Sequence, residues 1–202
     1  DGSCEYETVQ IGNQVWMQEN LKATHYQNGD AILTGLDNEG WINTNEGAFA
    51  IYDSSPSNAE IYGNLYNWYA VDDERGICPV DYRVSDSNDW IKLTDYLGGS
   101  EIAGGKLKLE GTEFWSSPNY GATNESGFSS MPGGNIDETN GNSYHLGNDA
   151  NYWTYDNNNN RFTLSYNSEE IIHHSGSYNL GLSVRCISNQ TPNIAISIPE
   201  DF

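Results

Sequence analysis

The chain has 202 residues, of which 36% are hydrophobic and 12% aromatic. This length suits one domain with a short appendage, and the 14 Tyr and 6 Trp predict a core built largely from aromatic rings. With 29 Asp and Glu against 8 Lys and Arg, the net charge of -21 would repel phosphate backbones and anionic lipids. We therefore expect neither nucleic acid nor a membrane as a partner.

The N-terminal third predicts a hairpin and a long loop. Apolar and β-branched residues flank a Gly-Asn dipeptide, which predicts two short strands within residues 6–17. Residues 22–57 are rich in Asn, Asp and Gly and predict an irregular loop. Three isolated aromatic residues should pin this loop to the core, namely Trp41, Phe49 and Tyr52.

Two helices are predicted next. The first spans residues 59–71, where apolar residues recur at helical offsets around Gly63, a residue that would permit close packing. The second begins after Asp86, which forms an acidic capping box with Asp89, and it ends at the Gly-Gly pair of residues 98–99. Large rings at periodic positions usually pack inward, so we expect Trp68, Trp90 and Trp153 in the core.

The remainder of the domain predicts strands. Short aromatic runs at residues 113–115, 151–155 and 161–166 read as antiparallel strands between Gly- and Asn-rich loops. Residues 181–187 alternate inward and outward positions and predict a central strand. Helices followed by strands indicate an α+β fold.

We place the domain at residues 1–189 and a distinct tail at residues 190–202. In the tail, Ile194, Ile196 and Ile198 alternate with smaller residues between two prolines, a pattern typical of one strand. A strand needs a sheet to pair with. The tail is therefore an interdomain linker, the first strand of a following domain, or a strand donated to a neighbouring chain.

The chain has three cysteines, Cys4, Cys78 and Cys186, none of them in the close pairs of zinc or thioredoxin-like sites. One long-range disulfide is the expected use, and Cys4 is the odd thiol if Cys78 pairs with Cys186. No apolar run approaches the roughly 20 residues of a membrane-spanning helix. These features favour a secreted or cell-surface protein.

Five motifs occur in a recognisable order: a strand through a Gly turn into Trp-Met and Glu-Asn-Leu, a Tyr-Gly-Asn-Leu-Tyr-Asn-Trp run, a Cys-Pro entry, a Gly-Phe-Ser followed by Pro-Gly-Gly, and a closing Val-Arg-Cys. They lie at residues 9–21, 62–70, 78–84, 127–134 and 181–186. In this order they resemble the Fibrobacter succinogenes major paralogous domain family, which is common in secreted proteins of Bacteroidetes-like bacteria.

The resemblance implies a C-type-lectin-like fold, with two helices flanking small twisted antiparallel sheets and long loops. It also supports a bridge between Cys78 and Cys186. The chain departs from the family pattern at residues 81–82 and 85–86, where Asp-Tyr and Ser-Asp stand for Gly-Trp and Pro-Ser. The variable loops would then carry the specificity of this member.

Oxygen-rich loops suggest calcium, because Ca²⁺ prefers carboxylate and amide oxygens. One candidate loop contains Asp137 and Glu138. A second constellation joins residues before Trp153 to residues after it, namely Asn148, Asp149, Asp156 and Asn157. Asx turns and plain solubility are the alternative uses of these side chains. Four tyrosines are candidates for stacking on a sugar or holding a peptide: Tyr144, Tyr155, Tyr166 and Tyr178.

We predict an extracellular recognition module, not an enzyme, that binds a glycan or peptide, with calcium as a candidate cofactor, within a larger adhesin or surface protein. No serine lies in a nucleophile elbow, and no His has a triad context. Two alternatives stay open. One is an assembly subunit whose tail pairs with a neighbouring chain, and the other is a polysaccharide hydrolase that uses two carboxylates.

Overall fold

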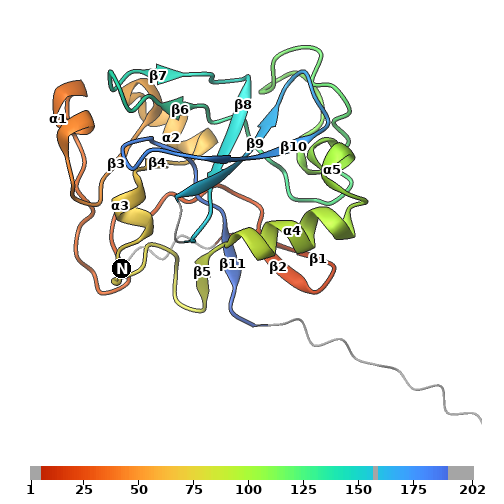
Figure 1. The fold of residues 1–202 in the computed structure, drawn as a ribbon, viewed down its shortest axis with the longest axis horizontal. Coiled ribbons are helices and arrows are strands. Elements are labelled where there is room, and N and C mark those ends of the chain that lie inside the picture. Colours follow the sequence, from red (N-terminus) through yellow and green to blue (C-terminus); the bar gives the residue numbers. More distant parts are fainter. Residues whose placement is uncertain (1–5, 157–158, 191–202) are drawn as a thin grey trace, which may run out of the picture.

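The computed structural model describes residues 6–156 and 159–190, and it combines short helices with small antiparallel sheets in a mixed α+β fold (Figure 1). The α+β prediction is thus confirmed. The predicted tail strand at residues 194–198, the thiol of Cys4 and the candidate ligand Asn157 lie outside the described residues. Among the described helices, none is long and apolar enough to cross a membrane.

The largest sheet has the strand order β1-β2-β11-β5 and is antiparallel throughout. The predicted hairpin is confirmed as β1 (Thr8–Ile11) and β2 (Gln14–Met17), with Gly12 at φ 59° in the turn. The predicted central strand is shorter than expected. Only β11 (Cys186–Ser188) lies in this sheet, between β2 and β5 (Tyr82–Val84), whereas residues 181–183 make isolated bridges to other segments.

A second antiparallel sheet has the order β10-β9-β8. It contains β8 (Asp149–Trp153), β9 (Asn160–Ser165) and β10 (Ile171–Ser175), so two further predicted strands are confirmed. The predicted strand at residues 113–115 is wrong, since these residues form a bend. Trp115 is nevertheless buried, and its indole N–H donates to the carbonyl of Ser130 at 2.9 Å. This contact fixes a loop to the core and is not part of strand pairing.

The predicted helix over residues 59–71 is also wrong. The chain forms α2 (Pro56–Tyr62), then β4 (Leu65–Tyr66), then α3 (Trp68–Val71). Gly63 breaks the helix at φ 78°, and a Cβ there would lie only 2.8 Å from the Cβ of Asn20. The close packing predicted at this glycine is therefore present. The helix does not continue, because β4 after it pairs with β3 (Phe49–Ala50), and strand pairing outweighs the helical spacing of the apolar residues.

The second predicted helix is confirmed as α4 (Ser87–Tyr96), and both hydrogen bonds of its capping box are present. The Gly-Gly pair ends α4, but α5 (Ser100–Leu107), which was not predicted, begins at once. In α5, Gly104 allows a close approach to the residues before β10, because a Cβ there would lie 2.5 Å from the carbonyl oxygen of Glu170.

The long loop contains α1 (Asn38–Asn43), β3 and the short 3-10 helix η1 (Tyr52–Ser54). As predicted, its aromatic residues Trp41, Phe49 and Tyr52 are buried. A small hairpin of β6 (Asn135–Ile136) and β7 (Ser143–Tyr144) packs beside it through Ile136, which shares a core cluster with Trp41.

Aromatic rings build the core, as the composition predicts. Trp90 of α4 stacks on Phe162 of β9 with ring centroids 5.3 Å apart, and Trp16 of β2 lies 5.2 Å from Trp90. Trp68 and Trp153 meet edge to face at 5.4 Å in a second cluster. The core prediction for Trp68, Trp90 and Trp153 is confirmed.

Two fully buried cations hold loops against the core, Arg185 and Lys108. The guanidinium of Arg185 donates to the carbonyls of Met17 and Phe128 at 2.8 and 2.7 Å and to the amide oxygen of Asn20 at 2.8 Å. The ammonium of Lys108 donates to three carbonyls at 2.7 to 2.9 Å, from Tyr120, Ser165 and Ser168. Both side chains bind backbone groups and so hold loops in place.

Candidate functional site

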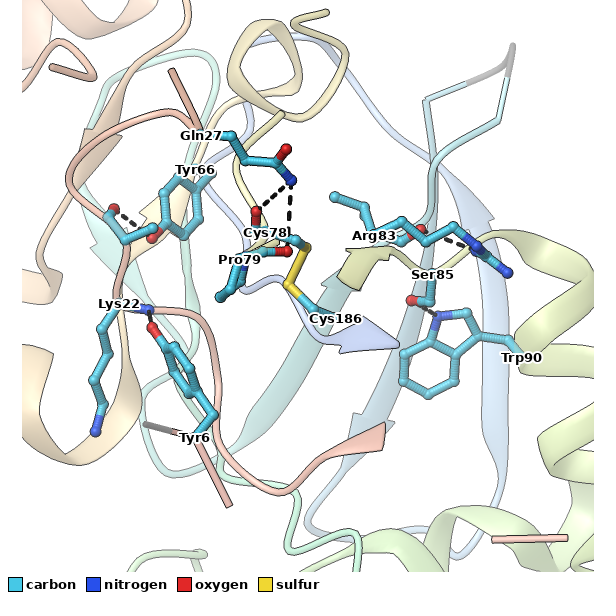
Figure 2. The surroundings of a disulfide bond; sticks show 12 residues. Tyr6, Lys22, Gln27, Tyr66, Cys78, Pro79, Arg83, Ser85, Trp90 and Cys186 are labelled. Carbon is cyan, nitrogen blue, oxygen red and sulfur yellow. Dashed lines mark hydrogen bonds between the residues drawn. A yellow bond between two sulfur atoms is a disulfide. The ribbon is translucent and has the colours of Figure 1, made fainter. Parts of the chain in front are cut away.

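The loop before β5 is fixed by a disulfide between Cys78 and Cys186 (Figure 2). The predicted bridge is therefore present in the structure. It joins residues 108 positions apart, and both cysteines are buried within the core cluster of Trp68 and Val184. The loop that contains Cys78 is consequently held to the core by this bridge.

Gln27 fastens a second loop onto the first. Its side-chain amide donates to the carbonyl of Cys78 at 2.8 Å, and its backbone N–H donates to the carbonyl of Gly76 at 3.0 Å. Figure 2 shows the amide nitrogen turned toward Cys78 and Pro79 and the amide oxygen turned away from them. Two segments about 50 residues apart in the sequence thereby form one surface.

Two adjoining hollows flank the Cys78 loop and share Gln27, Ile77 and Cys78. One has a volume of about 230 Å³ and the other about 300 Å³. Tyrosines line both, and we call this area the tyrosine surface, defined by Tyr6, Tyr26, Tyr82 and Tyr155. Its polar groups include Thr24, His25, Asp73 and Glu74.

An ion-pair network borders the tyrosine surface. Arg75 pairs with Asp73 at 2.7 Å and with Asp30 at 3.0 Å, and its guanidinium lies 3.9 Å from the ring centre of Tyr26. Burial, together with the charge of Asp73, raises the pKa of Tyr26 to about 12. Tyr26 is itself buried at 3% exposure, so the accessible rings of the surface are those of Tyr6, Tyr82 and Tyr155, beside amide and carboxylate groups.

The structure does not bring the four predicted ligand tyrosines together. Tyr155, which is 52% exposed, lines one of the hollows, and its backbone N–H is fixed by the carbonyl of Ser85 at 2.9 Å. Tyr144 lies exposed on β7, and Tyr178 stacks on Tyr69 with centroids 5.5 Å apart. Tyr166 is half-buried against the core.

The second calcium constellation is split by a strand. Asp149 begins β8 and Asp156 follows its end, so the two carboxylates are separated by about 13 Å or more of extended chain. Calcium ligands lie within about 2.6 Å of the ion. Asn148 and Asp149 therefore cannot share one ion with Asp156, and the constellation as predicted is not assembled.

The remaining acidic candidates have local roles. One oxygen of Asp137 accepts hydrogen bonds from the backbone N–H groups of Thr139 and Asn140 and from the Thr139 hydroxyl, which lowers the pKa of Asp137. Glu138 follows it on the same loop. Asp156 accepts from the hydroxyls of Ser87 and Thr154. Within residues 6–156 and 159–190, no group of three or more His, Cys, Asp or Glu side chains could hold a metal ion. Calcium binding stays a prediction.

The profile of the Fibrobacter succinogenes major domain matches residues 9–188. The chain belongs to this family. No curated protein and no solved structure matches this chain. The five motifs at the sequence level and the disulfide in the structure agree with this membership.

In this Fibrobacter succinogenes major domain, sequence reasoning missed most of the tyrosine surface. Tyr6, Tyr26 and Gln27 lie far from the Cys78 loop in sequence, and no local pattern marks them. Tyr82 follows the Cys-Pro motif by three residues and could have been found from the expected bridge. Of the four tyrosines on this surface, only Tyr155 was among the ligand candidates predicted from the sequence.

Proposed function

We propose that this domain is an extracellular recognition module that binds glycans at the tyrosine surface, within a larger adhesin or surface protein. The observation that supports it most is the cluster of three accessible tyrosines, Tyr6, Tyr82 and Tyr155, around a loop held by a disulfide and by Gln27. Rings, amide and carboxylate groups meet there on one side of the molecule.

The chemistry of this surface matches that of a sugar. A pyranose presents apolar C–H faces, which lose contact with water when they lie on an aromatic ring, and hydroxyl edges that need hydrogen-bond partners. Tyr82 and Tyr155 supply rings in the first hollow, and Asp73 and Glu74 supply acceptors. Gln27 lies between the two hollows, with an amide that can both donate and accept.

Preorganisation favours binding, because a surface that is already ordered loses little conformational entropy when a ligand arrives. This surface is restrained by the disulfide, by the hydrogen bonds of Gln27 and by the backbone hydrogen bond from Tyr155 to Ser85. A long-range disulfide also supports an oxidising, extracytoplasmic location.

A C-type-lectin-like arrangement, which the family resemblance implies, is part of this proposal. Small antiparallel sheets connected by long loops support it. Because one fold hosts many functions, ligand binding is assigned here to the residues of the tyrosine surface and not to the fold.

Isothermal titration calorimetry against a panel of oligosaccharides tests the proposal, with each titration repeated after removal of divalent cations. We expect at least one oligosaccharide to bind in the micromolar to millimolar range, and Tyr155→Ala to weaken it at least tenfold. Tyr120→Ala is the matched control, because Tyr120 is 56% exposed, similar to Tyr155, and does not line the hollows. Equal losses in the two variants would contradict a site at the tyrosine surface.

A further inference from the structure

A second surface lies where α4, α5 and strand β10 come together (Figure 1). Here α4, the start of α5 and strand β10 enclose a groove of about 480 Å³, which we call the β10 groove. Its floor is apolar, with buried Phe162 and Ile171. Two isoleucines on its walls remain accessible, Ile91 at 50% and Ile172 at 43%.

Strand β10 is an edge strand. The sheet order is β10-β9-β8, and within the described residues β10 pairs with β9 alone. An edge strand presents a row of unpaired N–H and C=O groups, to which an extended segment can add as a further strand. The backbone of β10 therefore provides hydrogen bonding next to an apolar floor.

The rim of the groove is negatively charged. Asp95, Glu101 and Glu170 line it, and none of the described residues that line the groove is Lys or Arg. None of the ion pairs among described residues involves these three carboxylates. His173 completes the lining, and its ring stacks on Phe162 at 4.8 Å.

We propose that the β10 groove binds an extended cationic peptide segment of another protein, in which Lys or Arg residues alternate with apolar ones. The segment adds to the edge of β10, its apolar side chains lie over the floor beside Ile91, and its cations reach the rim. Successive side chains of a strand point to opposite faces, so an alternating sequence satisfies floor and rim together.

Charge argues against two other occupants. The tail of this chain offers alternating isoleucines, but Glu200 and Asp201 follow them and would be repelled by the rim. A second copy carries a net charge of -21 and would be repelled as a whole. A cationic partner gains from the same field, which also speeds its association.

Fluorescence anisotropy with a labelled nonapeptide of alternating valine and lysine tests this site in the full chain. We expect micromolar binding that weakens at least tenfold in the triple variant Asp95→Asn, Glu101→Gln, Glu170→Gln. The matched control is Glu60→Gln, Glu110→Gln, Glu113→Gln, which changes the net charge equally at exposed residues outside the groove. Ile91→Ser should weaken binding more than Ile61→Ser, because Ile91 lines the groove at 50% exposure whereas Ile61 on α2 is 44% exposed and lies outside it.

If the peptide does not bind, the proposal is overturned. Equal losses of affinity in the two triple variants would also overturn it, because they would mean that net charge alone attracts the peptide. Tighter peptide binding by Ile196→Ser would overturn it in favour of the chain's own tail. A dimer in sedimentation that Ile91→Ser dissociates would overturn it in favour of a second copy. None of these variants touches the tyrosine surface, so this result is independent of the glycan proposal.

Discussion

Breaking the disulfide should destabilise the domain strongly and loosen the tyrosine surface. The bond closes a loop between residues 108 positions apart. On the chain-entropy account, releasing a loop of this size from the unfolded state costs about 5 kcal/mol of folding free energy. For a domain of this length, about 1 kcal/mol corresponds to roughly 2–4 °C, so the melting temperature should fall by about 10–20 °C.

Chemical denaturation with and without a strong thiol reductant measures this difference without leaving a cavity at Cys78 or Cys186. We expect the free energy of unfolding to fall by about 5 kcal/mol on reduction. Reduced protein that is still folded should also bind oligosaccharide more weakly, because the Cys78 loop loses its link to β11. A loss below about 1 kcal/mol would refute the loop-closure reasoning.

Further outcomes follow from individual contacts. Gly104→Ala should destabilise the domain by about 1–3 kcal/mol in denaturant titration, since the added Cβ meets the Glu170 carbonyl 2.5 Å away and outweighs the gain in helix propensity. Burial lowers the pKa of Lys108 from 10.5 to about 8. In that window the unfolded state binds more protons, so stability should rise with pH from about 8 to about 10, and Lys108→Met should abolish this rise. Lys108→Met should also cost several kcal/mol at pH 7, because three carbonyls lose their donor. For calcium, calorimetry on chelator-treated protein should show binding that Asp137→Asn weakens; no heat at millimolar Ca²⁺ would remove calcium from the account.

Local signals predicted the elements that depend on local chemistry. The hairpin turn at Gly12, the capping box of α4 and the burial of Trp90 follow from residues close in sequence. The helix predicted over residues 59–71 failed because Leu65 and Tyr66 pair with a distant strand. Helix α5 was missed because its position depends on how closely Gly104 approaches the segment before β10.

The candidate site shows the same division. The bridge between Cys78 and Cys186 was expected from a family resemblance, yet Tyr6, Tyr26 and Gln27 join that surface only through tertiary contacts. The predicted calcium constellation treated Asp149 and Asp156 as neighbours, although the length of β8 separates them. Nearness in sequence was a poor guide because an extended strand carries its two ends apart.

The glycan proposal is tested most directly by backbone and side-chain NMR of the labelled domain during titration with the tightest-binding oligosaccharide. If glycans bind at the tyrosine surface, chemical-shift changes begin at Gln27, Tyr82 and Tyr155, and the shifts of Tyr144 and Tyr178 stay unchanged. Changes centred on Tyr144 or Tyr178, with the tyrosine surface silent, would contradict it.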